Sequence, residues 1–240
     1  MKKLNETKVK ELPTYVQKQL QFVGVNQVKS STIVMVLIML DLFIAIPLFY
    51  PLTPVFFYIT IPLLFITHVW MVRLLFKNPY STQFEFILFI GTYGLVSAVC
   101  FFILSIKMSI HYLYIESISY YISSPAMFFI VLGVIVYYYH RKFSLISKRE
   151  AKGAVNQYGP LFALPPALGY MIAQSINHSE FLSNTVLVIV FYFFATFYSY
   201  VGIKFFHKYF FMKKNSHLVK LEQPMKRMQK EFQEKGIVIK

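Results

Sequence analysis

The chain has 240 residues, of which 57% are apolar and 14% charged, and its mean hydropathy is +0.54. This composition is too apolar and too poor in charge for a soluble domain of that length, so it predicts an integral membrane protein. The formal net charge of +14 would suggest nucleic-acid binding in a soluble protein. Here the basic residues lie outside the apolar blocks, so we expect a lipid bilayer and no nucleic acid as the partner.

The first 31 residues are predicted to form a cytoplasmic segment ahead of the first membrane span. Within residues 14–28, Val16, Leu20 and Val23 fall on one helical face. This pattern predicts an amphipathic helix that lies at the membrane surface. The apolar stretch that follows lacks a small-x-small cleavage site, so we expect it to be retained as an anchor.

Residues 32–212 are predicted to form a transmembrane domain of six helices. A spanning helix needs about 20 apolar residues to cross roughly 30 Å of hydrocarbon. Nearly uncharged windows of that size occur at residues 32–50, 55–72, 86–106, 117–139, 159–176 and 181–203. The sequence Pro-Leu-Thr-Pro at residues 51–54 leaves room only for a tight turn, which predicts an antiparallel hairpin of the first two spans.

Lysine and arginine set the predicted orientation, because they resist transfer across the membrane. Of the 24 Lys and Arg residues, 23 fall on one face of a six-span topology and Lys107 alone falls on the other. We therefore predict an all-α, polytopic helix bundle with both termini in the cytoplasm. The preference for lysine over arginine indicates an AT-rich bacterial genome, and hence a bacterial cell membrane.

Asp41 is the one charged residue well inside a predicted span, where an ionised carboxylate costs about 2.5–3.5 kcal/mol. His68 lies in the next span, at a depth that differs from that of Asp41 by about 6 Å. The two side chains can nearly bridge this offset, although Thr60 or Thr67 could satisfy the carboxyl equally well. Two interpretations stay open, a proton or cation site and a structural hydrogen-bonding group. We favour the second, because no other acidic residue lies at that depth.

Arg73 and Glu85 flank the short loop between the second and third predicted spans and are candidates for an interhelical pair. An exposed pair contributes about 0–1 kcal/mol, so we expect its role to be topological. The histidine and acidic residues match no metal-binding spacing, and the sequence has no H-E-x-x-H, G-x-S-x-G, Walker-type or C-x-x-C motif. We therefore predict no metal, no cofactor and no catalytic residue.

The fifth predicted span contains Gly159, Pro160, Pro165, Pro166 and Gly169. Each proline removes a backbone donor and disfavours helical geometry in the residue before it. We predict a kinked or broken helix that is shielded inside the bundle. Interrupted helices form substrate sites in transporters, but the first half of the chain has no matching interruption, so we favour a kinked packing helix.

Residues 213–240 are predicted to form a basic cytoplasmic tail that attracts anionic lipid headgroups. Apolar residues recur in it at spacings of three and four, which predicts a helical stripe that Pro224 interrupts. The stripe consists of Leu218, Leu221, Met225, Met228 and Phe232. The helix could rest on the membrane or bind a protein partner.

Three functions are compatible with these patterns. The first is a non-catalytic membrane protein that scaffolds, regulates or protects through contacts with a protein partner, which fits the missing motifs and the two amphipathic ends. The second is the membrane subunit of a transporter, such as an exporter permease driven by a separate ATPase, to which the likeness is one of architecture alone. The third, an intramembrane enzyme, needs a constellation around Asp41, His68 and the fifth span.

Overall fold

The computed structural model describes residues 12–22, 24–144 and 179–224. Every regular element in these ranges is a helix, and five helices are long and apolar enough to cross a membrane. For the described residues, the prediction of an all-α fold with several helices suited to spanning a membrane is therefore confirmed. The predicted fifth span lies outside the described residues, together with its candidate helix-breaking residues Gly159, Pro160, Pro165, Pro166 and Gly169.

The first crossing is built from several short elements, and the later crossings are continuous helices. A short helix, α1 (Thr14–Leu20), precedes the first crossing, which consists of η2 (Val25–Gln27), α2 (Val28–Ile33), the π-helix η3 (Val34–Ala45) and α3 (Ile46–Phe49). The others are α4 (Pro54–Phe76), α5 (Gln83–Leu113), α6 (Ile118–Ser144) and α8 (Glu180–Lys214), followed by the 3-10 turn η5 (Ser216–Leu218). Most helices run past their predicted windows, because charged residues bounded the windows whereas the helices continue through them.

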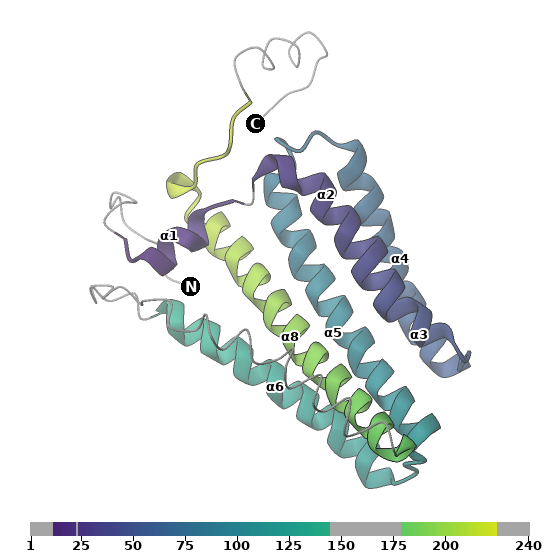
Figure 1. Ribbon diagram of the computed structural model, residues 1–240. Helices are drawn as coiled ribbons and strands as arrows, with labels where there is room; N and C mark the ends of the chain where they lie inside the picture. The colour runs from purple at the N-terminus through teal and green to yellow at the C-terminus, as the bar shows by residue number, and fades with distance from the viewer. Residues whose placement is uncertain (1–11, 23, 145–178, 225–240) are drawn as a thin grey trace.

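Helix α5 is the centre of the bundle. In Figure 1 it lies between α8 on one side and the hairpin of the first crossing with α4 on the other, and α6 packs beside α8. In the apolar window of α5, 78% of the residues are buried inside the protein. In the windows of the other four crossings, the buried share is 11–33%. The outer helices therefore present most of their apolar surface to the membrane.

Small residues bring the backbones of α5 and α8 into direct contact. A Cβ atom built on Gly94 would lie only 2.6 Å from the backbone nitrogen of Gly202. Ala98 on α5 and Ala195 and Ser199 on α8 continue this contact and are fully buried. Close packing of small side chains is how membrane helices gain van der Waals contact where lipid removes the hydrophobic drive between them.

Helices α6 and α8 run side by side in the same direction (Figure 1). The ring of Tyr139 packs against Tyr200, and Phe143, one turn further along α6, packs against His207 and Phe211. Residue numbers therefore rise together along the two helices. It follows that α6 ends and α8 begins at opposite ends of the bundle.

The two ends of the bundle differ in charge. We call the end at which α4 ends and α5 begins the basic end, and the other the opposite end. Each lysine and arginine that the structure describes, other than Lys107, lies in the half of the bundle toward the basic end. This asymmetry matches the distribution from which the orientation is predicted.

Helix α1 is shorter than the predicted helix over residues 14–28, and its apolar face packs on protein. Val16 and Leu20 are buried in a cluster with Phe143 and Phe211 at the basic end. The side chain of Gln19 also forms a hydrogen bond with His207, with a Nε2 to Nδ1 distance of 3.2 Å. Val16 and Leu20, two of the three residues expected to rest on the membrane surface, are thus turned into the bundle, and Val23 lies outside the described residues.

The described part of the tail is held against the start of α5. Gln83 Nε2 donates to the carbonyl oxygen of Glu222 at 2.9 Å, and the Glu222 amide donates to Gln83 Oε1 at 3.0 Å. The amide of Val25 donates to the Glu222 carboxylate at 3.1 Å. These bonds hold residues 219–224 as irregular chain, so Leu218 and Leu221 do not lie on a common α-helix. The other stripe residues, Met225, Met228 and Phe232, lie outside the described residues.

Candidate functional site

Asp41 and His68 form a polar pair between the first two membrane crossings. The Nε2 atom of His68 lies 3.0 Å from Oδ2 of Asp41, and its Nδ1 atom lies 2.8 Å from the carbonyl oxygen of Leu64. The tight turn between α3 and α4 sets the two side chains at similar depths. Thr60 and Thr67 donate to carbonyl oxygens of their own helix. Of the partners considered from the sequence, His68 is therefore the one that the structure brings to the carboxyl.

These contacts determine how many protons the pair holds. A carbonyl oxygen only accepts, so Nδ1 of His68 carries a hydrogen and donates to Leu64. The contact between Nε2 and Oδ2 then needs one further proton, either on the imidazole, which gives an ion pair, or on the carboxyl, which gives two neutral groups. Both forms have a net charge of zero. A neutral pair avoids the cost, of order 3 kcal/mol, of an isolated charge at mid-bilayer.

The pair lies at the membrane-facing edge of the hairpin. The side chains of His68 and Asp41 are 34% and 33% exposed. Exposed apolar side chains neighbour the pair at helical spacings on the same two helices, namely Leu37, Ile46, Phe65 and Val72. Within the part of the chain that the structure describes, Oδ2 is the Asp41 side-chain atom with a hydrogen-bond partner, and Oδ1 has none. An acceptor therefore faces an apolar environment.

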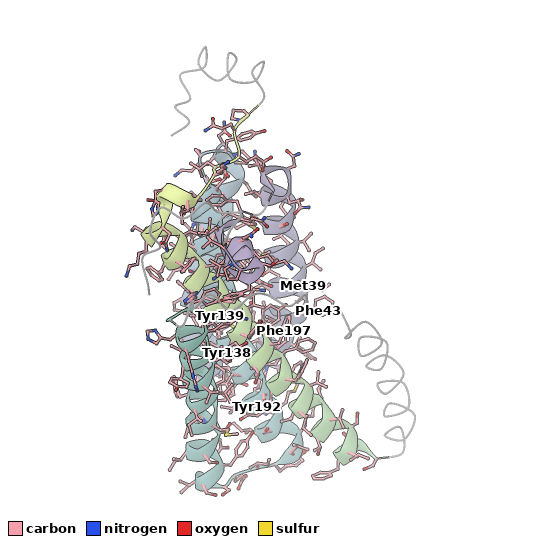
Figure 2. The ribbon with its side chains drawn as sticks, turned by 90° about the vertical axis from the view of Figure 1, so that its left-hand side faces the viewer. Met39, Phe43, Tyr138, Tyr139, Tyr192 and Phe197 are labelled. Carbon is pink, nitrogen blue, oxygen red and sulfur yellow. The ribbon has the colours of Figure 1, made fainter. Side chains whose placement is uncertain are left out.

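The backbone around Asp41 is a π-helix. The carbonyl oxygen of Asp41 accepts from the amide of Ile46, five residues later, where an α-helix would use the residue four later. The wide turns end just before Pro47, whose ring would clash with the carbonyl four residues earlier in a regular α-helix. Met39 and Phe43 project from the same helix away from the core (Figure 2). Segments of π-helix are rare and are frequent at functional sites.

Arg73 and Glu85 form a second polar group on α4 and α5 at the basic end. Arg73 Nε lies 2.6 Å from Oε1 of Glu85, and Lys77 Nζ lies 3.6 Å from Oε2. The indole N–H of Trp70 donates to the same carboxylate at 3.2 Å. Glu85 lies in the first turn of α5, where the helix dipole favours a negative charge. The structure thus contains the pair considered from the sequence, with two further partners on the carboxylate.

Lys107 is the polar residue whose role the sequence analysis missed. Helix α5 continues to Leu113, so Lys107 lies within the helix and is fully buried. Its Nζ donates to the carbonyl oxygens of Pro47 at 3.0 Å and Leu48 at 2.7 Å. Carbonyls in the last turn of a helix lack intrahelical donors and carry partial negative charge. The available sign of this role was that Lys107 is the one basic residue that the predicted topology places away from the cytoplasmic face.

No group of three or more His, Cys, Asp or Glu side chains suited to a metal ion occurs among the residues that the structure describes. His111, in the last turn of α5, instead contacts Thr53 through its Nε2 atom at 3.0 Å from Oγ1. Comparisons of the chain with protein-family models, with curated proteins and with solved structures found no match.

Proposed function

We propose that the chain spans the membrane six times with both termini in the cytoplasm of a bacterial cell. The parallel directions of α6 and α8 support this topology, because α6 ends at the basic end and α8 begins at the opposite end, so we expect a return crossing between them. The window at residues 159–176 is where the sequence predicts that return, and as a helix it would cover about 27 Å. The lysine-rich and arginine-rich basic end would face the cytoplasm.

A topology reporter tests this arrangement. Fused after Lys240 it should report the cytoplasm, and inserted after Glu116, in the loop between α5 and α6, it should report the outside. Insertion after Ser81, in the loop between α4 and α5, is the matched control and should agree with Lys240. Reporters after Lys240 and Glu116 that agree with each other would refute the six-span topology.

We propose further that the protein acts without catalysis, by binding a transmembrane helix of a partner protein at the Asp41–His68 pair. The observation that carries this proposal is the partial exposure of a polar pair on an apolar face of the hairpin. Exposed to hydrocarbon, an acceptor such as Oδ1 of Asp41 forfeits a hydrogen bond. A partner helix would supply the donor and cover the surrounding apolar side chains. Hydrogen bonds between membrane helices contribute roughly 0.6–2 kcal/mol.

The net charge of the pair indicates the chemistry of the partner. Because the pair is neutral in both of its protonation forms, a cationic donor would add an uncompensated charge to the membrane interior. A neutral donor satisfies Oδ1 of Asp41 without that cost. We therefore propose that the partner helix presents a serine, threonine, asparagine or glutamine side chain at the depth of Asp41.

Two substitutions of Asp41 test this role. Asp41→Asn keeps an acceptor oxygen in place, so we expect partner binding to stay within about threefold of the wild-type value. Asp41→Leu removes the acceptor and should weaken binding about tenfold, the equivalent of a lost bond of roughly 1.4 kcal/mol. The affinity is measured by co-purification with the partner at graded detergent dilution. Equal binding by the leucine and wild-type proteins would reject the proposal.

The single exchangeable proton and the π-helix favour one alternative, a membrane subunit of a transporter in which Asp41 carries a coupling proton. A carboxamide cannot exchange that proton. If Asp41 carries a coupling proton, Asp41→Asn should fold and insert but lose the cellular function of the protein. If Asp41 binds a partner helix, that function should survive in Asp41→Asn. Thermal stability of the purified variant, measured alongside, distinguishes lost coupling from misfolding.

A further inference from the structure

A groove of about 710 Å³ opens between α4 and α5, with Tyr209 of α8 on its border. Its wall is apolar and includes Phe65, Ile66, Val69 and Leu88, and its basic end carries Arg73 and Glu85. Phe65, Ile66 and Val69 are each more than half exposed. The groove is therefore open to the hydrocarbon of the bilayer and does not belong to the core.

The polarity of the groove changes along its length. Phe65 and Arg73 are eight residues apart on α4, which corresponds to about 12 Å along the helix axis. The part of the groove away from the basic end is lined by apolar side chains. The charged groups lie at the basic end, where α4 approaches the membrane surface. A phospholipid has the same order of groups, an apolar chain followed by a charged phosphate.

The charges at the basic end of the groove select the sign of the headgroup. Arg73 and Lys77 both contact the single carboxylate of Glu85, so this group has a net charge of +1. Lys213 adds a further positive charge, since its Nζ lies 5.9 Å from the centre of the Tyr209 ring. The contact from Arg73 to Glu85 uses Nε, and the terminal nitrogens of the half-exposed guanidinium are the groups that bind phosphate in pairs.

We propose that this groove binds one acyl chain of an anionic phospholipid from the leaflet at the basic end, with the lipid phosphate on Arg73. The site is distinct from a general attraction of the basic tail to lipid, because α4 and α5 supply both the chain-binding wall and the cation. Asp41 and His68 do not line the groove, and Phe65, which borders both the polar pair and the groove, is the residue that the two proposed sites share.

Trp70 is an internal reporter of this site. It is the only tryptophan of the chain, and it lines the groove, so the tryptophan fluorescence of the full-length protein arises at the site. The protein is reconstituted in phosphatidylcholine vesicles with increasing fractions of phosphatidylglycerol that carries bromine on its acyl chains, a quencher of indole fluorescence. A parallel series uses brominated phosphatidylcholine. We expect brominated phosphatidylglycerol to reach half-maximal quenching at about a fivefold lower mole fraction, the effect of one favourable basic contact.

Three variants, all of which retain Trp70, test the assignment. Arg73→Gln should abolish the preference for phosphatidylglycerol, and Val69→Phe, which fills the groove, should reduce quenching by both lipids. Arg141→Gln removes the same charge from α6 at the same end of the bundle and should leave the preference unchanged. Equal quenching by the two lipids in the wild-type protein, or a preference that survives Arg73→Gln, would overturn the proposal. Absence of quenching by either lipid would show that protein occupies the groove and would overturn it as well.

Discussion

Replacing Gly94 by valine is expected to destabilise the folded protein by about 3 kcal/mol, one of the largest effects of any single substitution. A Cβ atom at this position would lie 2.6 Å from the backbone nitrogen and 2.7 Å from the Cα atom of Gly202. Both clashes are with backbone, so no side-chain rotation relieves them and α5 and α8 have to separate. The loss is measured as the fall in thermal unfolding temperature of the purified protein in detergent.

Gly133 provides the matched control for this substitution. It lies inside α6, and a Cβ atom built on it has no neighbour within 4 Å among the residues that the structure describes. Gly133→Ala should be neutral or should stabilise the protein by up to about 1 kcal/mol, because alanine is the better helix former. If Gly94→Val were as stable as Gly133→Ala, the close crossing of α5 and α8 would be wrong.

Replacing Lys107 by methionine is expected to destabilise the protein by about 2–3 kcal/mol. Methionine fills much of the same space but leaves the buried carbonyls of Pro47 and Leu48 without their donor. Lys107→Gln retains an N–H donor without the charge, so an intermediate loss is expected. Chemical or thermal unfolding of the purified variants gives the order of the three proteins.

Lys29 is the control position for the loss of a lysine. It is exposed at the basic end, and Lys29→Met should change stability by no more than about 0.5 kcal/mol. If Lys107→Met were as stable as Lys29→Met, the contact of Lys107 with the end of α3 would contribute nothing to the stability of the protein. The two hydrogen bonds from Lys107 would then not help to hold the first crossing to α5.

Hydrophobic length alone was enough to locate the five membrane helices that the structure describes, because the requirement for about 20 apolar residues is strict. The hairpin at residues 51–54 also followed from local chemistry, since two prolines in four residues leave space only for a turn. The ends of the helices could not be predicted from the apolar windows. A helix continues through charged residues that rise to the membrane surface, as α8 does to Lys214.

The Asp41–His68 contact was within reach of sequence reasoning because one tight turn fixes the relative depth of the two helices. Lys107 was not, since its partners are backbone carbonyls at the end of a different helix and a carbonyl has no sequence pattern. The lining of the groove was also hidden, because it depends on how α4, α5 and α8 pack side by side. Contacts fixed by a short loop were predictable, and contacts fixed by tertiary packing were not.

The division of the bundle into a tight core and an outer hairpin agrees with the proposed function. The small residues of α5 and α8 hold the centre, where 78% of the α5 window is buried. The first crossing and α4 are mostly exposed, and they carry the polar pair on their outer edge. This hairpin therefore offers a face to another membrane helix without disturbing the α5–α8 contact.

Photocrosslinking in native membranes shows whether a protein helix lies against the Asp41–His68 pair. A photoreactive residue at Leu37, a neighbour of Asp41 on η3, is compared with one at Ile130, an exposed position on α6. If a partner helix binds at this pair, we expect one discrete protein adduct from Leu37, kept in Asp41→Asn, strongly reduced in Asp41→Leu and absent from Ile130. Lipid adducts alone at Leu37, or a protein adduct that is indifferent to Asp41→Leu, would contradict it.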